Sequence, residues 1–283
     1  FCDLNMLMDI EEAFLKYVVA AVLEQCGDEL AFLDGYTKSG LVEKLRARAG
    51  GGMTRVSHAE AIEILKNEFP LAIWETVYVT VLATAFAVLI GLPLGILLVT
   101  GEKNGVLPLP KGVMHVLGVI INLLRSVPFL ILMIMVFPLT RLIVGTAVGT
   151  TASIVPLVIA AFPFIARLVE SSLREVNPNI IEAAQSMGAS PFQIIVKVMI
   201  PESVPSLISN ATIAITTILG YSAMSGIIGG GGLGKIAINY GYYRYKYLVM
   251  LIAVVLLIVL VQIFQSVGTH LAVKSDKRLK RKI

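Results

Sequence analysis

Long stretches without a charged residue constrain this chain more than any other feature of its sequence. Asp, Glu, Lys and Arg are absent from four stretches of 25 to 32 residues: 76–101, 142–166, 203–234 and 247–273. A fifth stretch, 112–140, contains one charged residue, Arg125. Because a helix needs about 20 apolar residues to cross about 30 Å of hydrocarbon, each stretch is long enough to span a membrane. The sequence therefore predicts an all-α polytopic membrane protein with five spanning helices, at about 76–100, 118–140, 148–170, 204–227 and 247–271.

The composition favours a membrane protein over a soluble one. Apolar residues make up 57% and charged residues 15% of the 283 positions, against about 45–50% and about 25% in soluble domains. Buried core helices of a soluble protein are the alternative, but their apolar runs are shorter, about 10–14 residues. The net charge of +4 is also unevenly distributed, because 1–75 hold 13 acidic and 7 basic residues, whereas 76–283 hold 6 and 16. The bases form no stripe of the kind that binds nucleic acid, so no nucleic-acid partner is expected.

The positions of Lys and Arg between the predicted spans indicate the orientation of the chain. Cytoplasmic loops of membrane proteins carry an excess of both residues. One side holds four: Arg141, Lys235, Arg244 and Lys246. The other side holds twelve: Lys103, Lys111, Arg125, Arg167, Arg174, Lys197 and six in the basic tail 272–283. This difference predicts a cytoplasmic C-terminus and an external N-terminus, with the tail attracted to anionic membrane lipid.

The first 52 residues do not share the membrane pattern. They are acidic and contain no apolar segment long enough for a signal peptide or a span. Two interpretations stay open. In the first, Met53 is the native start and 1–52 is upstream sequence translated in frame; a purine-rich ribosome-binding site would then account for the three glycines at 50–52. In the second, 1–52 is a genuine acidic helical extension. Ser57 and Glu60 then form a capping box that opens an amphipathic lead-in helix within 53–75.

The longest predicted cytoplasmic connection, 171–203, contains strong helix-boundary signals. Asn177 precedes a proline and is expected to cap a helix that ends at Gly188. Ser190 then opens a second helix, in which Gln193 completes a capping box. A simple tether between two spans would need none of these signals, so a compact cytoplasmic unit is expected.

The second of these short helices carries apolar residues. It is expected to end at about Met199, before Pro201, because proline disfavours continuation of a helix. Phe192, Ile195 and Met199 are predicted to form an apolar stripe along it. The sequence thus predicts two short, sharply bounded helices that form a rigid projection.

Part of this connection resembles a known family. Glu182-Ala183-Ala184, three residues, Gly188, nine residues and Val198-Met199-Ile200-Pro201 are similar to the E-A-A-x3-G-x9-I-x-L-P loop of binding-protein-dependent ABC importer permeases. Val and Ile stand at 198 and 200, where the family pattern has Ile and Leu. In that family the loop docks into a cleft on a separate ATPase subunit. The resemblance therefore implies an ATPase-coupling loop formed by Glu182, Ala183, Ala184, Gly188, Ser190, Pro191, Phe192 and Pro201.

Further motifs resemble the methionine-importer branch of this family and cover about 70–283. They lie at 125–129 (Arg-Ser-Val-Pro-Phe), 163–167 (Pro-Phe-Ile-Ala-Arg), 220–224 (Gly-Tyr-Ser-Ala-Met) and 240–242 (Tyr-Gly-Tyr). The resemblance implies a homodimeric permease in the bacterial plasma (inner) membrane, which imports D- and L-methionine. Its implied partners are two ATP-binding cassette subunits, which bind the ATP, and a periplasmic or lipid-anchored methionine-binding protein. The chain itself would bind no cofactor and catalyse no reaction.

The fourth predicted span has a polar face. Its hydroxyl and amide side chains lie on one side, at Ser206, Ser209, Asn210, Thr212, Thr216, Thr217, Tyr221 and Ser225. Such a face avoids lipid, and it either lines a water-filled path or packs against another helix. The resemblance favours a path, with a constriction near the end of the helix. The implied translocation path comprises Asn210, Thr217, Tyr221, Ser222, Met224 and Ser225.

Two glycine-rich segments invite interpretation. Gly91-Leu92-Pro93-Leu94-Gly95 indicates either a kink or a close helix contact. The run 229–235 matches the spacing of a phosphate loop, but Ile236 stands where the Mg²⁺-binding Ser or Thr belongs. No strand is predicted before this run, which argues equally against a dinucleotide fingerprint. A flexible turn at the external mouth of the protein is the better prediction.

No catalytic or metal centre is predicted. The histidines and cysteines lack metal-ligand spacing: His58, His115, His270, Cys2 and Cys26. Glu170 is the one acid near a span, and Arg167 or Arg174 is expected to neutralise it as an ion pair. The alternatives to a methionine permease are a permease for another amino acid or small solute, a passive channel and a membrane-embedded enzyme.

Overall fold

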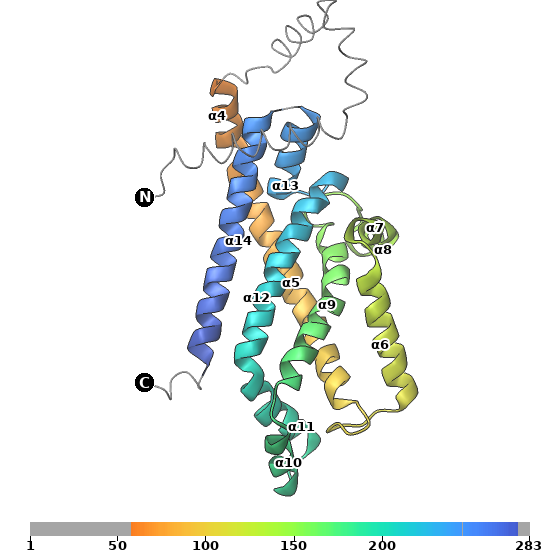
Figure 1. The fold of residues 1–283 in the computed structure, drawn as a ribbon. Coiled ribbons are helices and arrows are strands. Elements are labelled where there is room, and N and C mark those ends of the chain that lie inside the picture. Colours follow the sequence, from red (N-terminus) through yellow and green to blue (C-terminus); the bar gives the residue numbers. More distant parts are fainter. Residues whose placement is uncertain (1–57, 245, 277–283) are drawn as a thin grey trace, which may run out of the picture. The chain divides into compact units, whose positions relative to one another are not determined.

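A computed structural model describes residues 58–244 and 246–276, which are helical and contain no strand. Four helices in this part are long and apolar enough to cross a membrane: α5 (Phe69–Thr100), α9 (Ile154–Arg174), the helix Pro191–Ile228, which contains α12 (Ile200–Ser225), and α14 (Tyr247–Ser275). These helices run alongside one another (Figure 1). The segment 1–52, the proposed start at Met53 and the predicted cap at Ser57 lie outside the described residues.

The first long helix begins earlier than predicted. A short helix, α4 (His58–Asn67), occupies part of the lead-in segment, and α5 starts at Phe69 rather than near 76. Pro70 stands in the first turn of α5, where its missing N–H costs no helical hydrogen bond. The helix therefore includes seven residues, 69–75, that lie before the charge-free stretch 76–101, and Glu75 is one of them.

The second predicted span, a continuous helix at 118–140, is wrong. The chain instead forms α6 (Lys111–Ser126) and α7 (Phe129–Met135), whose axes are bent by 107°. The break lies at Val127-Pro128, where Val127 has extended backbone angles (φ −77°, ψ 126°). The proline ring disfavours the helical conformation in the residue before it, and the proline supplies no N–H. The bent pair counts as a fifth crossing only if both helices are taken together.

The structure also differs from the prediction that the second short helix ends before Pro201. The backbone does not stop there, because α11 (Pro191–Ile194), the π-helical segment η1 (Ile195–Met199) and α12 form one continuous helix. The N–H of Ile200 donates to the carbonyl of Ile195, five residues earlier. This wider turn relieves the clash that a proline imposes on the preceding α-helical turn. The predicted projection is therefore continuous with a spanning helix.

Close contact between α5 and α9 forms the centre of the described bundle. A Cβ added to Gly91 would lie 2.8 Å from the carbonyl oxygen of Phe162, and one added to Gly95 would lie 2.6 Å from that of Ala166. Only glycine permits this approach, and α5 continues as one helix through Pro93. Of the two interpretations of the 91–95 segment, close packing is the one that the structure supports.

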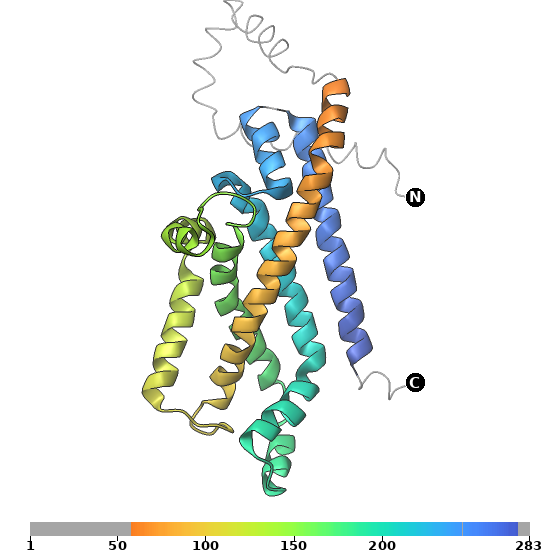
Figure 2. The same cartoon turned by 180° about the vertical axis from the view of Figure 1, so that it is seen from behind.

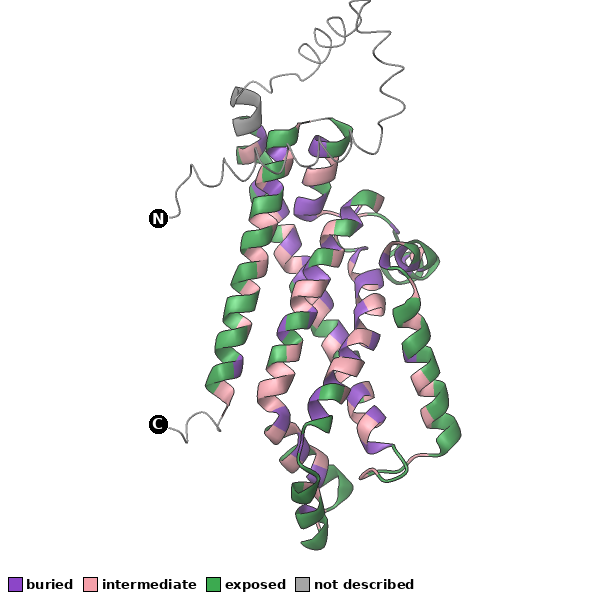
Figure 3. Cartoon of the chain, in the orientation of Figure 1, coloured by how far each residue is buried: buried purple, intermediate pink, exposed green. Residues whose placement is uncertain are grey.

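Burial separates an inner from an outer surface of the bundle. Figure 3 shows exposed positions along α14 and α6, whereas buried positions gather on α5, α9 and α12. Only 11% of the most apolar stretch of α14 is buried. Figure 2 shows α5 crossing the bundle obliquely from the end with α13 (Gly232–Ile236) toward the end with α10 (Pro178–Ser186) and α11. We call these the α13 end and the loop end.

Candidate functional site

The loop end is held by the caps that the sequence predicts. The Asn177 side chain accepts a hydrogen bond from the N–H of Asn179 (3.0 Å) and caps α10. The hydroxyl oxygen of Ser190 accepts from the backbone N–H of Gln193 (3.4 Å), and the side-chain Oε1 of Gln193 accepts from the backbone N–H of Ser190 (2.9 Å). These reciprocal bonds form a capping box on α11. Both predicted helix starts are confirmed.

The end of α10 is closed by a Schellman turn. Gly188 has φ +77°, in the left-handed region. Its N–H donates to the carbonyl of Gln185 (2.9 Å), and the N–H of Ala189 donates to that of Ala184 (3.1 Å). These two bonds define the turn and occupy carbonyls that would otherwise lack partners. The predicted helix end at Gly188 is confirmed, and its glycine is required by the backbone conformation.

Buried anchors and exposed apolar residues are separated within the loop. Ala184, Ile194 and Met199 are buried against the bundle, whereas Met187 and Phe192 are 82% and 74% exposed. The predicted stripe that joined Phe192 to Met199 is therefore wrong as a single surface. The π-helical turn after α11 has more residues per turn than an α-helix, so residues seven positions apart no longer share a face.

The predicted coupling residues lie together at the loop end, where α10 and α11 project from the bundle (Figure 1). Only Ala184 among them is buried. The remaining seven are exposed: Glu182, Ala183, Gly188, Ser190, Pro191, Phe192 and Pro201. The loop thus presents an accessible surface on a backbone fixed by two caps, a Schellman turn and buried anchors.

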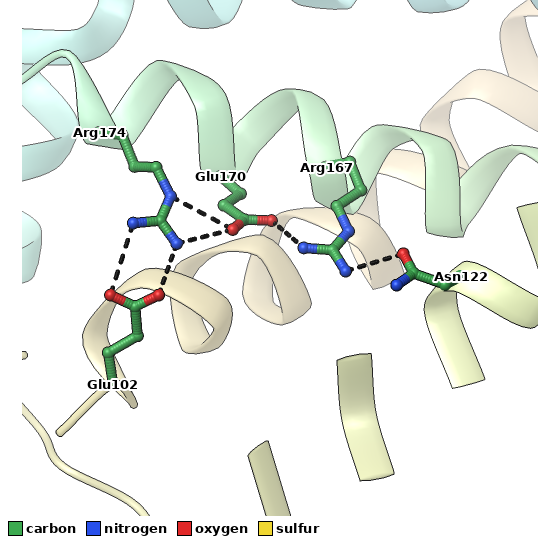
Figure 4. A network of polar contacts seen from close by, with 5 residues as sticks. All are labelled: Glu102, Asn122, Arg167, Glu170 and Arg174. Atoms are coloured by element: carbon green, nitrogen blue, oxygen red, sulfur yellow. Dashed lines mark hydrogen bonds and ion pairs between the residues drawn. The ribbon is translucent and has the colours of Figure 1, made fainter. Parts of the chain in front are cut away.

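An ion-pair network connects α9 to α6 and to the turn after α5, near the loop end (Figure 4). Glu170 on α9 contacts both neighbouring arginines, Arg167 at 2.6 Å and Arg174 at 2.9 Å. Arg174 also pairs with Glu102 beyond α5 (2.6 Å), and Arg167 donates to the side-chain oxygen of Asn122 on α6 (2.9 Å). The predicted neutralisation of Glu170 is confirmed, with both arginines contributing. The network also reaches α6 and the turn after α5, which sequence spacing alone did not connect to it.

The first half of the polar face on α12 packs against α9. The Asn210 amide donates to the hydroxyl oxygen of Ser172 (2.7 Å) and to the carbonyl of Leu168 (3.1 Å). Ser206 donates to the same Ser172 hydroxyl (3.3 Å). Of the two predictions for the polar face, these bonds support packing against another helix for this half. They also place Asn210 at the edge of a cavity of about 260 Å³ between α5, α9 and α12.

The second half of this face has different surroundings. The Tyr221 ring stacks on Phe129 at the start of α7, with centroids 4.5 Å apart and planes 5° from parallel. Ser222 and Ser225 are buried, and Met224 is 41% exposed. The hydroxyls of Thr217, Ser222 and Ser225 donate to carbonyls of their own helix. Tyr221 and Met224 are thus the members of the predicted path that present large side chains beyond α12 in this half.

A carboxylate that sequence analysis missed organises the α13 end. Glu75 accepts a hydrogen bond from the hydroxyl of Thr150 (2.8 Å) and another from the N–H of Gly232 (2.8 Å). The next N–H, of Leu233, donates to the hydroxyl of Thr76 (2.9 Å). Part of the turn predicted at 229–235 is instead helical, because α13 begins at Gly232, and side chains of α5 bond to its first residues. The flexibility of the segment stays a prediction. The available signal was the position of Glu75, directly before the charge-free stretch.

The same end contains a buried aromatic hydroxyl. Tyr240 donates a hydrogen bond to the carboxylate of Glu68, at the start of α5. This bond is the main cause that raises the pKa of Tyr240, and burial raises it further. The guanidinium carbon of Arg244 lies 4.8 Å from the ring centroid. Glu68 and Glu75 thus attach α5 to the segment that leads into α14.

Neither a metal centre nor a phosphate loop is found in the described part of the chain. No group of three or more His, Cys, Asp and Glu residues there is placed to hold a metal ion. The glycine run follows a 3₁₀ turn (Gly226–Ile228) and continues into α13, so it lacks the preceding strand of a phosphate loop.

Comparisons with known proteins identify a family. The chain is 52% identical over 208 residues to a probable D-methionine transport system permease protein of Vibrio cholerae, covering 73% of this chain and 92% of the relative. It is 47% identical over 208 residues to a Pasteurella multocida protein of the same description, covering 74% and 95%. It also superimposes on a chain of the MetNI methionine ABC transporter, solved in an inward-facing conformation, with a TM-score of 0.72 and 42% identity over 74% of this chain and 96% of that chain.

The family described as binding-protein-dependent transport system inner membrane component matches residues 91–274. This range contains the capped loop, the polar helix face and the ion-pair network. The chain therefore belongs to the family of inner membrane components of binding-protein-dependent transport systems.

Proposed function

We propose that this chain is the permease subunit of an ATP-driven importer for D- and L-methionine. Two copies would enclose the substrate path, two ATP-binding cassette subunits would bind and hydrolyse ATP, and a periplasmic or lipid-anchored protein would deliver methionine. The names of the relatives and of the matched transporter support this substrate. The chain itself would contribute the path, without a cofactor or a catalytic residue.

One observation carries the mechanism: the exposed loop tip and the polar helix face belong to one continuous helix. Phe192 lies in its first turn, and Tyr221 lies near its other end, within Pro191–Ile228. A force applied to the tip by an ATPase subunit would be transmitted along this helix, because the helical backbone is continuous from the tip to the polar face. The Schellman turn and the capping box would keep the tip in the shape that docks.

The coupling surface would be the exposed side of the loop. Met187 and Phe192 are large apolar residues that the bundle leaves uncovered. Aromatic and methionine side chains are enriched in protein interfaces, where a few buried anchors supply most of the binding energy. Glu182 and Pro191 would complete the polar and backbone contacts around these two anchors.

The loop end would lie in the cytoplasm. Arg125 lies in the last turn of α6, so it does not belong with the loop-end charges. Removing it leaves eleven Lys and Arg residues on that side against four on the other, and the positive-inside rule still gives the same orientation. The C-terminus would then be cytoplasmic, and the α13 end and the N-terminus would be external.

The experiment that tests this function compares Phe192→Ala with Leu142→Ala in proteoliposomes that contain all proposed subunits. Leu142 is another large, exposed apolar residue, which lies on α8 (Phe137–Val144), is 83% exposed and is far from the loop in sequence. We expect Phe192→Ala to lower ATP-dependent methionine uptake about tenfold or more, as for loss of an interface anchor, and Leu142→Ala to leave it unchanged. Equal uptake by both variants would contradict coupling through the loop, and ATP-independent flux would indicate a channel.

A further inference from the structure

Arg125 is a charged residue that the proposed coupling mechanism does not use. It is the single charge in the stretch 112–140, and its side chain is exposed. Its guanidinium forms neither a hydrogen bond nor an ion pair with any residue that the structure describes. A cation in an apolar span without a protein partner is a candidate for a functional site.

The position of Arg125 separates it from the loop-end charges. Lys111 begins α6 near the loop end, and Arg125 is 14 residues further along the helix, a rise of about 21 Å. Its guanidinium therefore cannot reach the aqueous surface at the loop end. The carbonyl groups at the C-terminus of α6 favour a cation in the last turn, which explains how the fold tolerates the charge.

A small cavity adjoins this cation. Its volume is about 160 Å³, and its lining includes Arg125, Phe129, Phe164 and Tyr221, drawn from α6, α7, α9 and α12. The break at Pro128 turns α7 across the bundle and brings Phe129 onto the Tyr221 ring. A continuous helix at 118–140 would not form this arrangement. Four helices thus line one cavity with an arginine and three aromatic residues.

We propose that Arg125 binds the carboxylate of the transported amino acid at this cavity, while the aromatic rings contact its side chain. The planar guanidinium matches a carboxylate with two parallel hydrogen bonds. Aromatic rings suit an unbranched thioether, because sulfur interacts favourably with ring edges. The cavity is smaller than the roughly 300–1,000 Å³ of sites for drug-sized ligands, so it fits only a small solute. This inference rests on the proposed function, because it assigns a contact to the substrate on its path.

The test measures equilibrium binding to the full chain in lipid nanodiscs by saturation-transfer NMR. The probes are methionine and methioninamide, which lacks the carboxylate. The variants are Arg125→Gln, Arg125→Lys and the control Arg141→Gln, which removes an exposed arginine of α8 outside the cavity. Nanodiscs of phosphatidylcholine are compared with nanodiscs that also contain anionic phosphatidylglycerol.

We expect Arg125→Gln to weaken methionine binding about tenfold or more, as for loss of a charge-assisted hydrogen bond. Arg125→Lys should lie between this variant and the unmodified chain, and Arg141→Gln should match the unmodified chain. Methioninamide should bind Arg125→Gln no more weakly than the unmodified chain. Unchanged methionine binding in Arg125→Gln, no saturable methionine binding in the unmodified chain, or an effect seen only with phosphatidylglycerol would overturn the proposal. The last result would identify a lipid phosphate as the anion.

Failure of the proposed function gives a different result. If methionine binding depends on Arg125 but reconstituted uptake is absent, the carboxylate site stands and the assignment as an ATP-driven importer falls. If uptake is ATP-dependent and Arg125→Gln transports and binds methionine normally, the importer function is supported and the carboxylate site at Arg125 is refuted.

Discussion

The left-handed backbone at Gly188 gives a graded prediction for the coupling loop. With φ at +77°, any L-amino acid with a Cβ is strained there. A Cβ added at this position meets no atom within 4 Å, so the strain is not complicated by a clash. We expect Gly188→Ala to cost the loop about 1–2 kcal/mol. Gly188→Asn should cost less, because asparagine tolerates this region better than other residues with a Cβ.

Hydrogen exchange of the loop measures this cost. The Ala189 N–H is bound to the Ala184 carbonyl only while the Schellman turn is intact. A cost of about 1–2 kcal/mol shifts the opening equilibrium about 5- to 30-fold, so this amide should exchange faster by that factor in Gly188→Ala. Gly118→Ala is the matched control, because Gly118 also has no atom within 4 Å of an added Cβ but has no positive φ.

The prediction includes function as well as exchange. ATP-dependent uptake should be highest in the unmodified chain, lower in Gly188→Asn and lowest in Gly188→Ala, because the loop conformation that docks is populated less in each successive protein. Exchange at Ala189 that is unchanged in Gly188→Ala, or faster in Gly188→Asn than in Gly188→Ala, would refute the role assigned to the backbone conformation.

Three further perturbations test the packing. Gly95→Val places a side chain 2.6 Å from the carbonyl of α9 and should destabilise the detergent-solubilised protein by about 1–3 kcal/mol, whereas Gly118→Val should not, so equal thermal shifts would argue against close packing. Glu75→Gln removes a charged hydrogen-bond acceptor, and the segment 229–235 should lose about 1.5–3 kcal/mol of local stability. Its amides should therefore exchange faster. Unchanged exchange would show that the carboxylate does not hold this segment. Tyr240 should ionise above pH 10 by absorbance, and Glu68→Gln should lower that pKa. Since the folded pKa is raised, the stability from this bond is present below pH 10 and is lost as the pH rises through the folded value, and titration at or below pH 10 would contradict the bond.

Two prolines show which parts of the fold could be predicted from sequence. Long charge-free stretches located the spanning helices, because the cost of a charge in hydrocarbon is large and independent of the neighbours. Pro128 and Pro201 carry the same local signal, yet the first ends a helix and the second does not. Around Pro201 a π-helical turn absorbs the clash, and the buried side chains of Ile194 and Met199 hold the helix in place. Tertiary packing therefore decides between the two outcomes.

The candidate site divides in the same way. The caps at Asn177 and Ser190 depend on residues within three positions, so the sequence predicted them correctly. The glycine run is held by Glu75, 157 residues away from Gly232, and no local pattern signals that contact. Composition alone therefore suggested a turn where the structure has the start of α13 bonded to α5.

The central claim is that this chain is the path of an ATP-driven methionine importer. The most direct measurement is accumulation of labelled methionine in proteoliposomes that contain the chain, the ATPase and the methionine-binding protein, with ATP supplied on the loop-end side. We predict that methionine accumulates above its external concentration with ATP but not with ADP, and that unlabelled methionine competes better than other amino acids. Equilibration without ATP, or stronger competition by a different solute, would contradict this account.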